Sequence, residues 1–229
     1  MTLTLGLPSK GRLMADTIAW FAARGIAIAQ AGAEREYRAE AAGLPGLEVV
    51  MLSAGEVPRE LAAGRIHLGV TGEDLIRERV PQAGLESLAR MGFGKANLVI
   101  AVPAFWIDVE TMSDLDAACA DFRETHGTAL RIATKYHVLT RSFFREHGIA
   151  DYRLVDSQGA TEASPANRTA EAISDITTTG ATLRANHLRV LEDGEILKSQ
   201  ANLWHSPSAP WSEPAERTLA ELRARLDQS

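Results

Sequence analysis

Residues 172–183 read Ala-Ile-Ser-Asp-Ile-Thr-Thr-Thr-Gly-Ala-Thr-Leu, and this stretch decides the class of fold. Its first part, Ala172–Ile176, is a short apolar run of the kind that forms a buried strand. A loop of Thr and Gly follows, and the residues after it form a helical pattern through Asn186. A strand that passes through a short polar loop into a helix is typical of α/β proteins.

The same loop carries the most specific chemical signal in the chain. Hydroxyls and backbone N–H groups at the start of a helix point at one place, where the helix dipole also favours an anion. Because the loop contains no lysine, it differs from the Walker loop and suits a single phosphate monoester. Asp175, just upstream, would accept hydrogen bonds from sugar hydroxyls. The pattern therefore indicates a ribose 5-phosphate site; the alternative is a Thr-rich turn whose hydroxyls only cap the helix.

On both sides of this unit, apolar runs alternate with helical patterns, which predicts an α/β fold with largely parallel strands. The sequence pattern changes near residue 90. Two further expected strands, Leu188–Leu191 and Ile196–Leu203, form a pair that would return the chain to the first domain. We therefore expect two lobes, 1–91 plus 185–229 and 92–184, joined by two crossings. The expected strands before this pair are Thr2–Leu7, Glu48–Leu52, Ile66–Thr71, Ala96–Val102, Leu130–Thr134, Tyr152–Val155 and Ala172–Ile176.

Composition narrows the class of protein. The chain has 229 residues, of which 45% are hydrophobic and 24% charged, as in globular proteins with a substantial core. A net charge of −6 argues against binding to nucleic acid or an anionic membrane. Cys119 is the single cysteine, in an apolar helical pattern that predicts a buried thiol. No signal-peptide pattern and no run of 18 apolar residues is present, so we expect a cytoplasmic protein.

The basic residues are divided unevenly, with four lysines against 20 arginines, and three of the lysines, Lys10, Lys95 and Lys135, fall in segments that look like loops. The uneven ratio favours codon bias, whereas the positions of these lysines suggest a role in chemistry. Lys10 and Arg12 flank Gly11 directly after the first expected strand, at the edge where open α/β sheets bind ligands. A diphosphate leaving group would need such charge. The alternative is a strand-to-helix turn with solvated basic residues.

Two further lysines follow loop or strand patterns. Lys95 ends the segment Gly-Phe-Gly-Lys, and Lys135 lies between Thr134 and Tyr136 at the end of an expected strand. The polar neighbours of Lys135 favour a binding role more than the surroundings of Lys95 do. For both, a solvated loop charge is the alternative.

Five motifs occur in the order in which they occur in the catalytic chain of the ATP phosphoribosyltransferase family, the first enzyme of histidine biosynthesis. The resemblance spans residues 3 to 205, and its last motif is the most specific. Because the chain stops soon after this motif, it resembles the short form of the family, which lacks a C-terminal regulatory domain. The motifs are Pro8-Ser-Lys-Gly-Arg-Leu, Gly69-Val-Thr-Gly-Glu-Asp-Leu, Gly92-Phe-Gly-Lys, Arg131-Ile-Ala-Thr-Lys-Tyr and Asp175-Ile-Thr-Thr-Thr-Gly-Ala-Thr-Leu-Arg-Ala-Asn-His-Leu.

The resemblance implies a two-lobed fold like that of type II periplasmic binding proteins. It implies an enzyme that joins N1 of the adenine of ATP to phosphoribosyl pyrophosphate, giving N1-(5-phosphoribosyl)-ATP and diphosphate. Mg²⁺ would be carried by the substrate, with no metal ligand from the protein. The implied partner is a regulatory subunit similar to a histidyl-tRNA synthetase, in a hetero-oligomer.

The resemblance also assigns roles residue by residue. Asp175 matches the acid that meets the ribose hydroxyls, and Glu162 matches the Glu of the family's Glu-x-x-Pro stretch, which implies contact with phosphoribosyl pyrophosphate. We expect Lys10 and Arg12 to act on the leaving diphosphate. Candidate contacts to nucleotide or diphosphate are Gly11, Lys95, Thr134, Lys135 and Tyr136. The positions that match the loop holding the 5-phosphate are Thr177, Thr178, Thr179, Gly180, Ala181 and Thr182.

The chain departs from the family pattern in three places. Arg168 and His187 stand where the family commonly has Gly, and both flank the expected phosphate loop. Ser53 and Glu56 replace an Arg-x-x-Asp pattern, so this chain lacks an arginine there and its hold on the nucleotide is open.

Two rival functions share parts of this pattern. A phosphoribosyltransferase of the other common fold, with a different base acceptor, would also place an acid before Thr-Thr-Gly. A non-catalytic two-lobed module that binds a solute or senses an effector would share the architecture. The lack of a signal peptide and of a DNA-binding helix pair disfavours both versions of this module.

Overall fold

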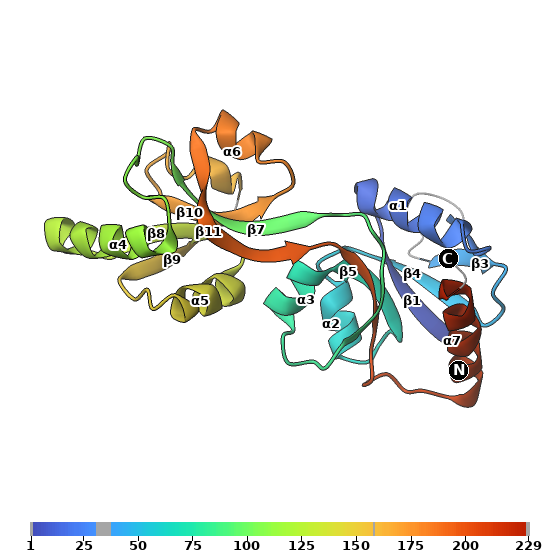
Figure 1. Cartoon of the computed structure of the whole chain (residues 1–229). Coiled ribbons are helices and arrows are strands. Elements are labelled where there is room, and N and C mark those ends of the chain that lie inside the picture. Colours follow the sequence, from blue (N-terminus) through green and yellow to red (C-terminus); the bar gives the residue numbers. More distant parts are fainter. Residues whose placement is uncertain (1, 31–37, 158, 228–229) are drawn as a thin grey trace. The chain divides into compact units, whose positions relative to one another are not determined.

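The computed structural model describes residues 2–30, 38–157 and 159–227. The chain forms two compact units: unit 1 is Met1–Gly94 with Gln200–Ser229, and unit 2 is Lys95–Ser199 (Figure 1). The chain passes from unit 1 into unit 2 and returns, which confirms the two predicted crossings. In the part of the chain that is described, no helix is both long and apolar enough to cross a membrane.

Unit 1 contains one mixed sheet. Its described strands are β1 (Leu3–Pro8), β2 (Ala27–Gln30), β3 (Arg38–Ala42), β4 (Leu47–Leu52), β5 (Leu68–Gly72), β6 (Glu86–Arg90) and β12 (Ala201–His205). They lie in the order β2-β3-β4-β1-β5-β12-β6. β1 runs parallel to both of its neighbours, β4 and β5, whereas β12 runs antiparallel to β5 and β6.

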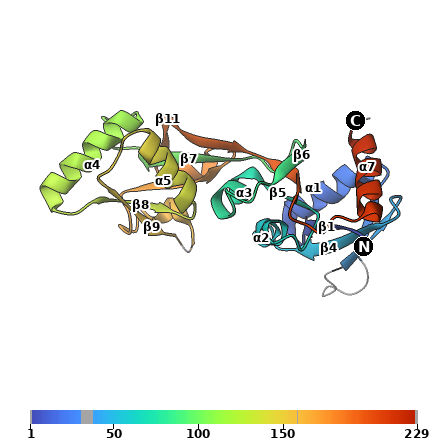
Figure 2. The same ribbon diagram turned by 90° about the horizontal axis from the view of Figure 1, so that it is seen from below.

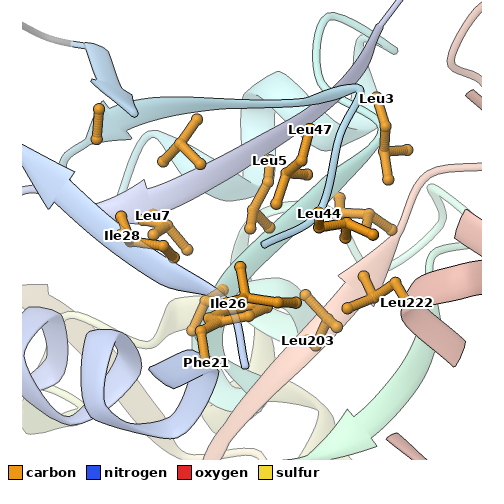
Figure 3. Packing of buried hydrophobic residues seen from close by; sticks show 14 of the residues in the cluster. Leu3, Leu5, Leu7, Phe21, Ile26, Ile28, Leu44, Leu47, Leu203 and Leu222 are labelled. Atoms are coloured by element: carbon orange, nitrogen blue, oxygen red, sulfur yellow. The ribbon is translucent and has the colours of Figure 1, made fainter. Parts of the chain in front are cut away.

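Helices cover both faces of this sheet. α1 (Gly11–Ala22) and α7 (Glu213–Leu226) contribute to the larger core, and α2 (Val57–Ala62) and α3 (Glu73–Arg79) to the smaller one on the other face. The alternating apolar residues of β1 lie in the larger core. Figure 3 shows them packed among side chains of α1, β12 and α7, the labelled residues being Leu3, Leu5, Leu7, Phe21, Leu203 and Leu222.

Unit 2 is a five-stranded sheet with helices on both faces. Its strands lie in the order β11 (Leu188–Ser199), β7 (Ala96–Pro103), β10 (Ala172–Thr177), β8 (Leu130–Thr134) and β9 (Tyr152–Asp156). α4 (Met112–His126) and α5 (His137–Glu146) cover one face, and α6 (Ala181–Ala185) packs on the other. Figure 1 shows α5 and α6 on opposite sides of the strands, and Figure 2 shows α5 in front of them.

The predicted buried thiol is confirmed. Cys119 lies in α4 with none of its surface exposed. Burial raises the pKa of this thiol to about 12. Because the thiolate is the reactive form of cysteine, Cys119 is an unreactive part of the core.

The boundary of unit 2 differs from the predicted 92–184. Residues 188–199 form one strand, β11, which pairs with β7 from Leu188 opposite Pro103 to Ser199 opposite Ala96. This pairing keeps the whole strand in unit 2 and moves the return crossing to Gln200. The predicted strand pair is therefore wrong in its bounds. The register of β11 on β7 shifts between Val190 and Glu195, near the predicted break, but the residues on both sides of the shift pair with β7, and the next strand, β12, begins only at Ala201.

The prediction of largely parallel strands is also wrong. Among the described pairs, only β1–β4, β1–β5, β8–β10 and β8–β9 are parallel. β7 runs antiparallel to both of its neighbours, and β2–β3–β4 form an antiparallel edge. A fully buried strand has the same apolar sequence in either direction, so its composition does not report its direction.

A cluster of two histidines and a tryptophan ties the segment before α7 to the sheet of unit 1. Trp211 lies 4.8 Å, centre to centre, from both His67 and His205, and donates from Nε1 to the Ser206 carbonyl at 2.9 Å. His67 Nδ1 accepts from the Thr4 N–H at 3.1 Å. This hydrogen bond requires an unprotonated Nδ1, so His67 is neutral in the fold.

Acid should weaken unit 1 through these histidines. Burial lowers the pKa of both His67 and His205, so below the ordinary value of about 6.5 the unfolded chain takes up protons that the folded chain resists. This stability is complete above pH 6.5 and falls by at most about 1.4 kcal/mol per pH unit per histidine below it. His67→Gln keeps an acceptor and a donor without titrating. We expect it to reduce the fall in melting temperature between pH 7.5 and 5.5, followed by tryptophan fluorescence.

The matched control is His147→Gln at the end of α5, where the side chain is exposed. This variant should keep the pH dependence of the parent. An unchanged pH dependence in His67→Gln would contradict the role given to His67.

Candidate functional site

The loop between β10 and α6 is tightly wound. Gly180 has φ +70°, a left-handed conformation that ordinary residues avoid, and it caps α6. Thr177 Oγ1 accepts from the Gly180 N–H at 2.9 Å, and Thr179 Oγ1 accepts from the Ala181 N–H at 3.3 Å. The loop hydroxyls therefore shape the turn itself, as the capping alternative proposed, and they do so at the edge of a cavity.

This cavity has a volume of about 350 Å³, and we call it the loop cavity. It brings together the loop, both acids expected to contact phosphoribosyl pyrophosphate, and one of the lysines. The first N–H groups of a helix have no partner within the helix, so the start of α6 offers donors beside the cavity. The lining residues are Lys95, Ala96, Glu162, Asp175, Ile176, Thr177, Thr178, Thr179, Ala181, Thr182 and Leu183.

Asp175 is the most electrostatically perturbed group in this cavity. Burial raises the pKa of its carboxyl above the ordinary value. Hydrogen bonds from the Ile176 N–H, at 2.8 Å to Oδ1, and from the Thr161 hydroxyl oppose this shift, as does the charge of Lys135. The carboxylate is therefore held by few donors and keeps the capacity to accept more.

Thr161 supports this acid, although sequence reasoning missed it. It begins a short 3₁₀ turn, η1 (Thr161–Ala163), has none of its surface exposed, and its hydroxyl lies 2.9 Å from that of Ser157. Glu162 is the next residue in the same turn and lines the loop cavity. A threonine directly before Glu162 is the sequence signal that could have indicated Thr161. Hydroxyl residues are common in turns, so this signal alone does not identify a functional residue.

The two lysines of unit 2 have different surroundings. Lys95 precedes β7, lines the loop cavity, and its carbonyl accepts from the Thr178 hydroxyl at 3.1 Å. Lys135 is exposed, and its Nζ donates to the Gly159 carbonyl at 2.8 Å. Sequence reasoning ranked Lys135 above Lys95, whereas only Lys95 lines the cavity; Lys135 acts on Asp175 through its charge.

Thr134 and Tyr136 do not line the loop cavity. Thr134 has none of its surface exposed, and its Oγ1 accepts from the Tyr136 N–H at 2.9 Å. Tyr136 is also buried, at the start of α5. The geometry of both residues fits the turn between β8 and α5 better than a ligand contact.

Lys10, Gly11 and Arg12 lie in unit 1, where β1 gives way to α1, and all three are exposed. Gly11 has φ +77°, which lets the chain turn sharply into the helix. Lys10 lines a cavity of about 480 Å³ in this unit with Ser9, Ser53, Glu56 and three residues of β4, whereas Arg12 does not.

The departure at residues 53–56 forms a closed turn. Glu56 Oε2 accepts from the Ser53 N–H at 2.8 Å, and hydrogen bonds from Ser53 lower the pKa of the Glu56 carboxyl. Arg79 of α3 donates from Nη1 to the Gly55 carbonyl at 3.0 Å. A guanidinium therefore lies against this turn even though residue 53 is not an arginine.

In residues 2–30, 38–157 and 159–227, no group of three or more His, Cys, Asp or Glu side chains is placed to hold a metal ion. The two carboxylates of the loop cavity, Glu162 and Asp175, are oxygen donors of the type that Mg²⁺ accepts. Two carboxylates fit a metal that receives most of its ligands from a bound phosphate and water.

Comparison with known proteins decides the family. The family model described as HisG: ATP phosphoribosyltransferase matches residues 53–228. The chain belongs to the ATP phosphoribosyltransferase family. It is 60% identical over 228 residues to an ATP phosphoribosyltransferase of Cereibacter sphaeroides, covering 99% of this chain and 96% of the relative. A relative of the same name from Bradyrhizobium diazoefficiens is 54% identical, with 93% of this chain and 66% of the relative covered.

Solved structures confirm the expected fold. A chain of the ATP phosphoribosyl transferase (HisG:HisZ) complex from Thermotoga maritima matches with a TM-score of 0.72 at 22% identity, covering 98% of this chain and 97% of that chain. The periplasmic aliphatic sulphonate binding protein SsuA from Escherichia coli matches with a TM-score of 0.55 at 16% identity, covering 98% and 70%. The fold is therefore shared by the family and by periplasmic binding proteins, as the resemblance implied.

Membership of this family disfavours both rival functions. A phosphoribosyltransferase of the other common fold would not give these structural matches, and the named relatives make a non-catalytic module the less favoured alternative. The individual roles of the site residues stay predictions.

Asp175→Asn should stabilise the unliganded protein while lowering activity. Because the folded carboxyl has a raised pKa, the folded chain binds its proton more readily than the unfolded chain, and stability falls as the pH rises through the ordinary value. The amide removes this penalty, so we expect a higher melting temperature than the parent at pH 8 and a smaller difference near pH 4. The catalytic rate should fall by at least about 10²-fold.

Asp121→Asn on the exposed side of α4 is the matched control and should change neither quantity. A lower melting temperature of Asp175→Asn at pH 8 would show that the carboxylate stabilises the fold and would contradict this account.

Proposed function

We propose that this chain transfers the phosphoribosyl group of phosphoribosyl pyrophosphate to N1 of the adenine of ATP, as the first step of L-histidine biosynthesis. The observation that carries the proposal is the loop cavity, in which a Thr/Gly loop at a helix start faces two carboxylates. Family membership supplies the reaction class. In the reaction, a C–N bond forms at C1 of the ribose, the C–O bond to diphosphate breaks, and the electron pair leaves with diphosphate.

The loop binds the 5-phosphate in this proposal. The hydroxyls of Thr179 and Thr182 and the backbone N–H groups that follow Ala181 at the start of α6 are donors, and the helix dipole favours the anion. Gly180 and Thr177 fix the conformation of the loop, so the loop loses little conformational entropy when the ligand binds.

Asp175 and Glu162 hold the ribose through its hydroxyls. A partly buried carboxylate with a raised pKa gains most when donors approach it, because they replace the water that burial removed. Lys95 adds a positive charge at the same cavity, opposite in sign to the phosphates. Together these residues fix the sugar so that only C1 has to react.

Lys10 and Arg12, in unit 1, have the role of neutralising the diphosphate as it leaves. Both are exposed cations at the carboxyl end of β1. Mg²⁺ carried by the diphosphate would supply further neutralising charge. Gly11, which lies between Lys10 and Arg12, has the left-handed backbone that this turn requires.

The nucleotide has a second cavity available in unit 1. The cavity beside Lys10, closed by the Ser53–Glu56 turn, has donors and an acceptor of the kind that a nucleotide uses. We propose a cytoplasmic hetero-oligomer with a regulatory subunit similar to a histidyl-tRNA synthetase. The structural neighbour from Thermotoga maritima supports this part, since it is a chain of a HisG:HisZ complex.

The direct test is release of diphosphate from ATP and phosphoribosyl pyrophosphate with Mg²⁺, with and without the regulatory subunit. Lys10→Met should lower kcat by about 10²–10³-fold, because it removes a preorganised charge from the leaving group. Lys198→Met is the control, since Lys198 is an exposed residue that pairs with Glu195 outside the loop cavity. No diphosphate release under either condition would favour the binding module instead.

Gly180→Val should abolish binding of phosphoribosyl pyrophosphate, measured by calorimetry. A branched residue is strained at φ +70°, and a Cβ there would lie 2.9 Å from Arg184 Nη1. Gly127→Val is the matched control: Gly127 has φ +69° at the end of α4, with open space around its Cβ position. Both variants should lose about 1–3 kcal/mol of stability from strain, but only Gly180→Val should lose the ligand.

A further inference from the structure

A second cavity of about 610 Å³ lies in unit 2 and shares no lining residue with the loop cavity. We call it the aromatic cavity, because Phe105, Trp106 and Phe122 line it together with Pro103 and Pro165. Its volume lies within the range of about 300–1,000 Å³ found for sites that bind small molecules. Flat rings and prolines on the walls suit a flat ligand.

The wall of the aromatic cavity is held in place without a ligand. Phe105 is 77% exposed, although large apolar side chains are normally buried. Its segment is nevertheless fixed, because Arg189 donates to the carbonyls of Trp106 at 2.7 Å and Val109 at 2.6 Å. An exposed aromatic side chain on a fixed backbone is a preformed contact surface.

Two strained residues line the same cavity. In the described part of the chain, Arg168 (φ 57°) and His187 (φ 56°) are the residues other than glycine with a left-handed backbone, and both line the aromatic cavity. Arg131 Nη2 donates to the Arg168 carbonyl at 3.1 Å, and the Ala104 N–H donates to the His187 carbonyl at 2.8 Å. Such strain persists where the surroundings enforce it, and it concentrates at binding sites.

The charge of the cavity favours an anion. Arg131 and Glu171 form a partly buried ion pair, with Nη2 and Oε1 2.5 Å apart, and so largely neutralise each other. Arg168 is exposed and forms no ion pair with any residue in 2–30, 38–157 or 159–227. One guanidinium therefore remains to meet a negative group, and guanidinium binds carboxylate or phosphate oxygens in a fork.

We propose that the aromatic cavity is a second ligand site, which takes a small flat aromatic molecule with one negative charge and holds that charge at Arg168. The aromatic walls account for the ring, and the unpaired guanidinium accounts for the charge. The proposal goes beyond the phosphoribosyl transfer and does not depend on it, since the two cavities have separate linings.

The test uses 8-anilinonaphthalene-1-sulfonate as an aromatic anion and N-phenyl-1-naphthylamine as its uncharged counterpart. Fluorescence titration of the whole chain should give one anion site per chain. The uncharged probe should bind about tenfold more weakly, the expected size of one hydrogen-bonded charge contact. Saturating phosphoribosyl pyrophosphate should not displace the anion.

Variants separate the two parts of the site. Arg168→Gln should remove most of the preference for the anion, and Arg168→Lys should restore part of it. Arg168→Gly, which relieves the backbone strain, should lose the preference as Gln does, so that charge and strain are distinguished. Trp106→Ala should weaken both probes by a similar factor of about ten. Arg141→Gln, an exposed arginine of α5 outside the cavity lining, is the control and should change neither probe.

Three outcomes would overturn the proposal. Equal affinity for the two probes in the parent would remove the role of Arg168. Several weak sites that ignore both Arg168→Gln and Trp106→Ala would mean general apolar adsorption. Displacement by phosphoribosyl pyrophosphate would place the probe in the loop cavity, and it would support the proposed function while removing the second site.

Discussion

The pairing of β7 with both of its neighbours is the constraint on which unit 2 depends. β7 runs antiparallel to β10 on one side and to β11 on the other. Asn97 of β7 lies opposite Thr177, so the chain that enters unit 2 at Lys95 arrives beside the Thr/Gly loop, where Thr178 donates to the Lys95 carbonyl. Ala96 lies opposite Ser199, so the chain leaves the unit beside the point where it entered. One strand thus positions both the loop cavity and the crossings.

The loop cavity holds one group that opposes the stability of the fold. The carboxylate of Asp175 is partly removed from water, which raises its pKa, whereas Gly180 and the hydroxyls of Thr177 and Thr179 stabilise the turn beside it. The surrounding sheet tolerates this carboxylate because β10 is paired on both sides. Thr161, which donates to Asp175, shows that the acid is also supported from the turn that carries Glu162.

Arg168 and His187 each follow, in sequence, a segment that contributes to the loop cavity, and both line the aromatic cavity. Arg168 follows the turn that carries Glu162, and His187 follows α6, the helix after the Thr/Gly loop. Both occupy backbone conformations that favour glycine, the residue that the resemblance to the family implies at these positions. Their side chains line the aromatic cavity, where a glycine would contribute none. This chain therefore keeps the turns that the loop cavity needs and adds side chains to the other cavity.

The sequence by itself determined the fold class, the helix and strand positions around 96–103, 130–134 and 172–177, and the Thr/Gly loop with Asp175, because apolar periodicity and turn residues are local properties. It did not reveal strand direction, the extent of β11, the hydrogen bond from Thr161 to Asp175, or that Lys95 lines the loop cavity and Lys135 does not. Those features depend on hydrogen bonds and burial between segments far apart in the chain: Leu188 with Pro103, Thr161 with Asp175, and Lys95 with Thr178. Only the tertiary structure decided them, because burial from water and hydrogen bonds to a distant segment exist only after the chain has folded.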